Sequence, residues 1–313
     1  MKVAIQYWYN KGKKKNKFMA FDGGYHGDTL GAMSVGFSSG FYEPFKEIIN
    51  KNFFFNFPEN WFGNNQVELA EEKSIRQVEN IINKEKDNIA AVIIEPLIQG
   101  AGGMRICRKE FLNKLIKIFK DSGIIIIFDE VMTGFGRTGK MFALDHLSEK
   151  PDIICLAKSL TGGYIPLAAT IFNEEIHKEF VDSNFKKTFL HGHTFTANPV
   201  GCSAALAALN LFAKDRTFKN IKKIEDTHKK CLSTLSKSST IKKIRILGSI
   251  AAFDLDNDRF KYGSKPVEDL KKKFLNKGLL LRPIGKTIYL MPPFCIKKKV
   301  LEDCYKIIEE VIN

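Results

Sequence analysis

Two residues that could do chemistry together follow short apolar runs in the middle of the chain. Asp129 comes directly after the run at 124–128, and Lys158 lies two residues beyond the run at 153–156. Uniformly apolar runs rich in β-branched residues are typical of strands buried on both faces. Ligands of open α/β sheets bind beyond the carboxyl ends of such strands. The sequence therefore predicts a carboxylate and an amine in one crevice.

This pair suits one cofactor in particular. A lysine held out of water has a lowered pKa, so its neutral amine can attack a carbonyl. Pyridoxal phosphate needs such an amine for its aldehyde and a carboxylate that keeps its ring nitrogen protonated. The alternative is a loop lysine whose ammonium group reaches solvent. We favour the cofactor because glycines follow both Asp129 and Lys158.

The elements that must position this pair alternate along the chain. The patterns predict a mostly parallel sheet with helices on both faces, from strands over 17–21, 90–94, 124–128, 153–156 and 168–172 and helices over 1–9, 74–83, 111–121, 174–181 and 200–212. Beyond a Lys/Ser-rich break at 236–243, a helix over 265–277 and strands over 279–282 and 287–291 predict a small α+β unit. We expect an α/β protein with a large cofactor-binding domain at 1–240 and a small C-terminal domain at 241–313.

Composition narrows the class of protein. The net charge is +14, but lysine carries most of it and is scattered through amphipathic segments, which argues against a nucleic-acid site. No apolar run approaches the roughly 20 residues of a membrane span, and the N-terminus lacks the charge order of a secretory signal. The six cysteines show no metal-binding spacing. We expect a cytoplasmic protein with reduced cysteines, no bound metal and no membrane partner.

One rival motif lies between the two candidate residues. Gly134, Gly136 and Gly139 form a GxGxxG pattern after a strand, as in dinucleotide-binding folds. Five residues separate it from the strand, however, and no helix followed by an acidic strand end comes next. The pattern alone is a weak signal for a nucleotide.

Three further polar features of the sequence could bind a ligand. His191 and His193 could bind a metal, but no third ligand has a suitable spacing. Thr194 is better placed to contact a phosphate through its hydroxyl group. Arg282 precedes Pro283 among apolar residues, where it could pair with a buried acid or bind a substrate carboxylate through two hydrogen bonds.

The longer motifs carry a family resemblance. The segments IIIIFDEVMTGFGRTG and PDIICLAKSLTGG resemble the signature of the class III pyridoxal-phosphate aminotransferases. GYHGDTLGAMSVG, EPLIQGAGGM, HGHTFTANP and RPIGKTIYLMPP are similar to motifs of the same family in the same order. The resemblance covers essentially the whole chain and implies the pyridoxal-phosphate transferase fold type I and a homodimer.

Roles follow from the resemblance by position. It implies that Lys158 forms the Schiff base with pyridoxal 5'-phosphate and moves the proton. Asp129 would hold the ring nitrogen, Val131 and Tyr25 would pack on opposite ring faces, and Thr194 would bind the phosphate across the dimer interface. On the substrate side, Arg282 would bind the carboxylate, with Tyr25, Asp28, Arg137 and Gly192 near the bound substrate.

Within this family, Ala101 stands where the glutamate-linked ornithine and γ-aminobutyrate enzymes have a glutamate. The motifs instead resemble the branch that aminates 8-amino-7-oxononanoate in biotin synthesis, with S-adenosylmethionine as the implied donor. His193 departs from the proline of many such sequences. Family members also have an N-terminal segment with a glycine–serine phosphate loop, so we expect this chain to match a member begun late. Another ω-amino acid aminotransferase and an inactive truncated homologue remain alternatives.

Overall fold

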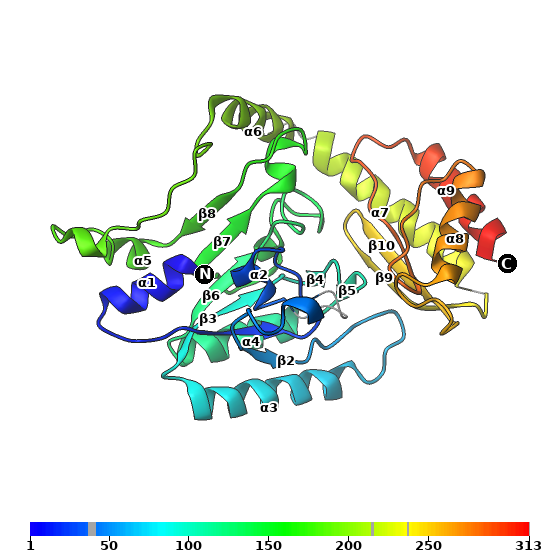
Figure 1. Cartoon of the computed structure of the whole chain (residues 1–313). Coiled ribbons are helices and arrows are strands. Elements are labelled where there is room, and N and C mark those ends of the chain that lie inside the picture. Colours follow the sequence, from blue (N-terminus) through cyan, green and yellow to red (C-terminus); the bar gives the residue numbers. More distant parts are fainter. Residues whose placement is uncertain (37–41, 214–215, 237, 313) are drawn as a thin grey trace.

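A six-stranded sheet forms the centre of the larger part of the molecule (Figure 1). The computed structural model describes residues 1–36, 42–213, 216–236 and 238–312. The strand order is β2-β1-β3-β6-β7-β8. All neighbours are parallel except β8, which runs antiparallel to β7. The strands are β1 (Lys17–Phe21), β2 (Phe53–Phe55), β3 (Ile89–Ile94), β6 (Ile125–Asp129), β7 (Ile153–Leu156) and β8 (Ala169–Phe172).

The isoleucine run of β6 is buried because helices cover both faces of the sheet. Ile126 and Phe128 belong to one core with α3 (Val67–Glu85) and α4 (Lys109–Asp121). Ile125 and Ile127 belong to a second core with α1 (Lys2–Asn10). Successive side chains of a strand point to opposite faces, so an uninterrupted apolar run fills both cores.

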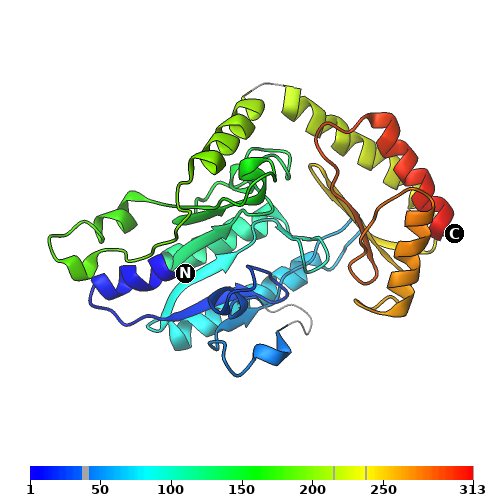
Figure 2. The same cartoon turned by 45° about the horizontal axis from the view of Figure 1, so that its top comes forward.

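A second unit, here called the C-terminal unit, contains the rest of the chain from α7 onward (Figure 2). Its antiparallel sheet has the order β11-β10-β9. Its elements are α7 (Arg216–Leu235), β9 (Ile241–Leu247), β10 (Ile250–Leu255), α8 (Lys265–Asn276), β11 (Thr287–Leu290) and α9 (Lys298–Ile312). Ile224 and Leu232 of α7 share its core with Phe253 and Ile308. The division after residue 240 stays a prediction, and this packing favours a division before α7.

The remaining elements are short and lie in the connections between the larger strands and helices. They are α2 (Leu30–Met33), η1 (Glu43–Phe45), the β4 (Ile98–Gln99) and β5 (Arg105–Ile106) pair, η2 (Ala143–His146), η3 (Lys158–Thr161), α5 (Glu174–Lys178) and η4 (Phe185–Lys187). The helix α6 (Pro199–Phe212) follows a long, exposed segment after α5 and lies near the beginning of α7 (Figures 1 and 2).

The expected α/β class and mostly parallel sheet are confirmed, with four local differences. The predicted strand over 279–282 is wrong: these residues form no ladder, because Leu279 and Leu281 use their N–H groups in turns and Pro283 has none to donate. The edge strand β2 was not predicted, because three consecutive phenylalanines show no alternation. The helix predicted over 174–181 ends at Lys178, and the one predicted over 74–83 extends over Val67–Glu85.

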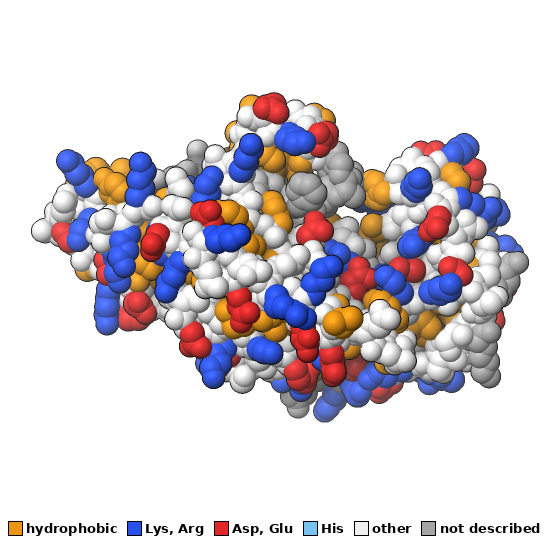
Figure 3. Space-filling view, turned by 90° about the horizontal axis from the view of Figure 1, so that it is seen from below, with side chains coloured by type: hydrophobic (Ala, Val, Ile, Leu, Met, Phe, Trp, Pro, Cys, Tyr) orange, Lys and Arg blue, Asp and Glu red, His pale blue; other side chains and the backbone are white. Residues whose placement is uncertain are grey.

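The charged surface is mixed in sign. Figure 3 shows Lys and Arg side chains interspersed with Asp and Glu on one face of the molecule. Several lysines of the described helices have an acidic neighbour one helical turn away, such as Lys299 beside Asp303 and Lys229 beside Glu225. In the described part of the chain, every helix is too short or too polar to cross a membrane.

Candidate active site

The predicted site lies where parallel strands end side by side. In the sheet, Ile94 of β3 is the partner of Phe128 in β6, and Asp129 is the partner of Cys155 in β7. Glu95 therefore follows β3, Asp129 ends β6 and Lys158 follows β7 at one edge. The turn that carries Tyr25 and His26 follows β1 at the same edge. The fold thus places Asp129 and Lys158 at the ends of adjacent strands.

Asp129 is a buried carboxylate with fixed orientation. Its residue is 8% exposed. One carboxylate oxygen, Oδ2, lies 2.8 Å from Nδ1 of His26, whose side chain is almost fully buried. The other oxygen, Oδ1, accepts a hydrogen bond from the backbone N–H of Val131 at 3.1 Å. Because Asp129 accepts, the network assigns the His26 proton to Nδ1. This geometry can present a carboxylate to a protonated ring nitrogen.

Lys158 differs from the expectation in one respect. The residue is exposed rather than buried, because the chain leaves the sheet after Leu156 and turns outward into η3. Its backbone has φ of +47°, a conformation that residues other than glycine adopt at a cost of about 1–3 kcal/mol. The N–H of Gly163 donates to its carbonyl oxygen at 3.1 Å, and α6 packs against η3. The surroundings therefore hold Lys158 in a strained turn, with its amine open to a ligand.

Tyr25 and Asp28 form a polar pair on the turn after β1. The Tyr25 hydroxyl donates to Oδ2 of Asp28 at 2.9 Å, and the Tyr25 backbone N–H donates to Oε1 of Glu95 at 3.0 Å. Burial, together with the hydrogen bond to Asp28, raises the pKa of Tyr25. Tyr42 donates a longer bond to Oδ1 of Asp28. This turn presents an aromatic ring and a carboxylate from one short segment.

Arg137 lies in the loop after Asp129 and contacts the C-terminal unit. Its guanidinium group donates to the Pro292 carbonyl oxygen at 2.9 Å and lies 4.6 Å from the centre of the Phe294 ring. Burial lowers the pKa of Arg137. In the described chain the Gly134–Gly139 stretch opens no helix, and only the short η2 follows it. The dinucleotide alternative therefore lacks the helix that its phosphate site requires.

The remaining predicted substrate and phosphate residues are exposed. Gly192 and Thr194 lie in the segment before α6 and have no described hydrogen bond to the residues around Asp129. Arg282 is exposed, which corrects the expected apolar environment and excludes a buried acid as its partner. Its Nη2 donates to the Tyr262 hydroxyl at 3.4 Å. An exposed guanidinium group at this position can still meet a substrate carboxylate.

Sequence reasoning missed three buried residues near the site. His26 orients Asp129, and Glu95 accepts from the N–H groups of Tyr25 and Gly100 at 3.0 Å each. Glu130 accepts from the Thr133 hydroxyl and from two backbone N–H groups of η2. Burial raises the pKa of both glutamates. Its position in the sequence could have indicated Glu95, because Glu95 follows an apolar strand just as Asp129 ends one.

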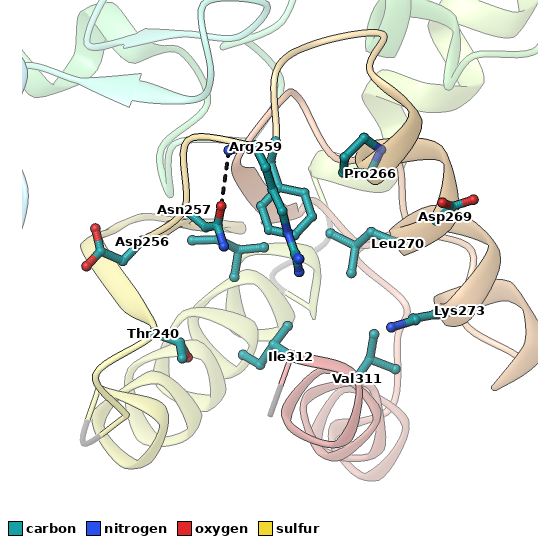
Figure 4. Close-up of a pocket in the computed structure, with 12 residues that line it drawn as sticks. Thr240, Asp256, Asn257, Arg259, Pro266, Asp269, Leu270, Lys273, Val311 and Ile312 are labelled. Carbon is teal, nitrogen blue, oxygen red and sulfur yellow. Dashed lines mark hydrogen bonds between the residues drawn. The ribbon is translucent and has the colours of Figure 1, made fainter.

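A separate cavity lies in the C-terminal unit, between the β10–α8 connection and the end of α9 (Figure 4). Its volume is about 470 Å³, and its lining includes Phe260, Leu270 and Ile312 with Arg259 and Lys273. None of the predicted site residues lines this cavity, so we do not assign the reaction to it. Among the residues described, no group of three or more His, Cys, Asp or Glu side chains could hold a metal ion.

The residues at the sheet edge fit pyridoxal phosphate by their chemistry. The buried Asp129 carboxylate matches a protonated ring nitrogen, and the open Lys158 amine matches an aldehyde. Tyr25 supplies an aromatic side chain from the turn after β1, which lies at the same edge. The donor types and strand positions of Asp129 and Lys158 fit this cofactor.

Comparison with known proteins agrees with the geometry. The family model for class-III aminotransferases matches residues 1–312. The chain is 43% identical to the adenosylmethionine-8-amino-7-oxononanoate aminotransferase of Synechococcus elongatus, over the whole chain and 73% of that protein. For the Staphylococcus aureus protein of the same name, the identity is 36%, over the whole chain and 71% of that protein.

Two solved structures share the fold. The adenosylmethionine-8-amino-7-oxononanoate aminotransferase of Methanocaldococcus jannaschii has a TM-score of 0.89 and 38% identity, over 99% of this chain and 71% of that one. An amine transaminase from an uncultivated Pseudomonas species, solved with pyridoxal phosphate bound, has a TM-score of 0.90 and 30% identity, over 99% and 72% of the two chains. The chain therefore belongs to the class-III aminotransferase family, whose members are pyridoxal-phosphate-dependent transaminases.

Proposed function

We propose that this protein transfers an amino group to 8-amino-7-oxononanoate, giving 7,8-diaminononanoate in biotin synthesis, with S-adenosylmethionine as the donor. The observation that carries the substrate assignment is the similarity along the whole chain to relatives named for this reaction. Ala101 supports it, since a glutamate-linked enzyme of this family would have a glutamate at that position.

Pyridoxal phosphate, when bound, supplies an aldehyde for the amino group and a ring that draws electrons from the reacting carbon. Asp129 would hold the ring nitrogen, oriented by His26 and by the N–H of Val131. Lys158 would bind at the aldehyde and carry a proton on Nζ, which has no hydrogen-bond partner among the described residues. Tyr25 and Val131 would pack against the ring. These are the roles that the family resemblance implies for the residues at this edge of the sheet.

On the substrate side, Arg282 would bind the carboxylate of the keto acid, since an exposed guanidinium group can donate two parallel hydrogen bonds. Asp28 would lie near the bound substrate, where the Tyr25 and Tyr42 hydroxyl groups orient its exposed carboxylate. Arg137 and Gly192 would lie beside the bound substrate. Arg137 is held at this position by its hydrogen bond to the Pro292 carbonyl oxygen.

We also propose a homodimer. The helix α6 is apolar along most of its sequence, yet only Gly201 and Ala205 are buried in the chain. Val200, Leu206 and Leu211 of α6 are exposed, and other segments expose Tyr164, Ile171, Phe185, Leu190 and Phe195. These exposed apolar residues support a protein interface around α6. A second copy on this face would bring the Thr194 hydroxyl group to the partner's cofactor phosphate.

A cytoplasmic location is part of the same proposal. All six cysteines are free thiols, as is usual in reducing compartments. The substrates are small molecules, and neither a nucleic acid nor a membrane is needed for the reaction.

A donor panel tests the function directly. Purified protein with pyridoxal phosphate is incubated with 8-amino-7-oxononanoate and either S-adenosylmethionine, lysine or a simple primary amine, and 7,8-diaminononanoate is measured by mass spectrometry. We expect 7,8-diaminononanoate to form with S-adenosylmethionine. Product only with lysine would correct the donor. Transfer from simple amines to other keto acids, without this product, would favour an ω-amino acid aminotransferase, and cofactor binding without any transfer would favour an inactive homologue.

A further inference from the structure

An arginine of the C-terminal unit reaches the sheet edge that carries the site. Arg245 lies in β9 and is 6% exposed. Its Nε donates to the Met104 carbonyl oxygen at 2.8 Å, and its Nη2 donates to the Gly103 carbonyl oxygen at 2.5 Å. Nη2 also lies 2.9 Å from Oδ1 of Asp254 in β10. One guanidinium group therefore joins the C-terminal sheet to a turn of the larger unit.

That turn, residues 100–104, is held in an uncommon conformation. Met104 has φ of +51°, which a residue other than glycine keeps only where its surroundings fix it. The turn also packs tightly: a Cβ on Gly102 would lie 2.7 Å from the carbonyl oxygen of Gly23. Turn 100–104 thus rests directly on the turn that carries Tyr25, and Arg245 holds its far end.

Glu95 ties the two turns together. This buried carboxylate accepts from the N–H of Gly100 through Oε2 and from the N–H of Tyr25 through Oε1, at 3.0 Å each. His26, the next residue after Tyr25, lies 2.8 Å from Asp129. A continuous set of contacts therefore runs from Arg245 through turn 100–104 and Glu95 to Asp129.

We propose that Arg245 is a positioning residue for the cofactor end of the site: by holding the Gly103 and Met104 carbonyl groups, it fixes turn 100–104 and, through Glu95, the Tyr25–His26 backbone beside Asp129. The inference rests on the proposed cofactor site. A lysine at this position keeps the charge near Asp254 but cannot hold two consecutive carbonyl groups in a fixed planar geometry. The alternative is that Arg245 only joins the two units.

A matched pair of variants separates positioning from general stability. Arg108 makes a comparable two-bond contact with Glu71, at 2.8 and 2.6 Å, outside the site. Arg245→Lys and Arg108→Lys are compared by the dissociation constant for pyridoxal phosphate, from absorbance titration of cofactor-free protein, and by the melting temperature of the cofactor-free form. We expect Arg245→Lys to weaken cofactor binding about tenfold and Arg108→Lys less than about twofold at a similar loss of melting temperature. Equal binding constants in the two variants would overturn the inference.

Glu95→Gln completes a double-mutant cycle with Arg245→Lys. If the two residues act through one turn, the double variant binds the cofactor about as weakly as the weaker single variant. Effects that multiply independently would contradict the proposed connection. Wild-type protein that fails to bind pyridoxal phosphate would instead refute the proposed function, so the two failures are distinguishable.

Discussion

His228 provides a pH test of the structure. It belongs to α7 and is fully buried in the C-terminal unit, where its ring meets the β9–β10 turn and α9. Its Nδ1 lies 2.7 Å from the Tyr305 hydroxyl and its Nε2 lies 3.2 Å from the Ser249 carbonyl oxygen. Neutral imidazole satisfies both contacts, accepting at Nδ1 and donating at Nε2. Ser249 in turn donates through its N–H to the Arg137 carbonyl oxygen at 3.0 Å, so His228 supports the loop that carries Arg137.

The magnitude follows from the pKa of His228. Burial lowers this pKa from 6.5 to about 4. The folded-state pKa lies below the unfolded one, so the unfolded state binds more protons between these values. This contribution to stability is complete above the unfolded pKa and is lost as the pH falls toward the folded one. From the linkage relation, the free energy of unfolding should fall by about 2 kcal/mol between about pH 7 and pH 5 through His228 alone.

The assay is urea unfolding of wild-type protein and His228→Gln at both pH values. Glutamine can donate and accept in place of imidazole but does not titrate in this range. All other groups titrate in both proteins, so the difference between their pH dependences isolates His228. We expect wild-type protein to lose about 2 kcal/mol more than the variant. Equal losses would refute the assignment of a buried neutral imidazole. His177→Gln, an exposed histidine of α5, is the control and should behave as wild type.

Three further predictions concern the site and the dimer. Asp129→Asn should keep the cofactor bound but lower kcat at least about 100-fold, because a neutral amide does not stabilise a protonated ring nitrogen; an unchanged kcat contradicts its role. Arg282→Gln should raise KM for the keto acid about tenfold or more with a smaller effect on kcat, whereas the exposed Arg259→Gln in the same unit should change neither. Leu206→Asp should convert dimer to monomer in analytical ultracentrifugation, and Leu275→Asp on α8 should not; a dimer that survives Leu206→Asp places the interface elsewhere.

The parts of the fold with uninterrupted apolar runs were predictable. The isoleucine runs before Asp129 and Lys158 predict buried strands, and the structure has β6 and β7 there. The structure of the residues before Pro283 was not predictable. Their apolar pattern is typical of a strand, but their backbone N–H groups are used in turns. The edge strand β2 depends on pairing with β1, which no local pattern of phenylalanines reveals.

For the site, the sequence could predict which residue types take part but not how they are oriented. Asp129 and Lys158 could be chosen from residue type and strand position, and the fold places them at adjacent strand ends. The orientation of Asp129 by His26 and the contact of Arg245 with turn 100–104 join residues about a hundred or more positions apart. Such contacts depend on the assembled units, so no local pattern could predict them. The exposure of Lys158 likewise depends on how the chain leaves β7.

The most direct test of the central claim is to locate the cofactor on the chain. Protein incubated with pyridoxal phosphate is reduced with borohydride, digested and analysed by peptide mass spectrometry. We expect the cofactor mass on the peptide that contains Lys158 and no such mass in Lys158→Ala. Lys140 is an exposed lysine before η2, so Lys140→Ala should be labelled like wild type. Labelling at another lysine, or equal labelling with and without Lys158, would contradict this expectation.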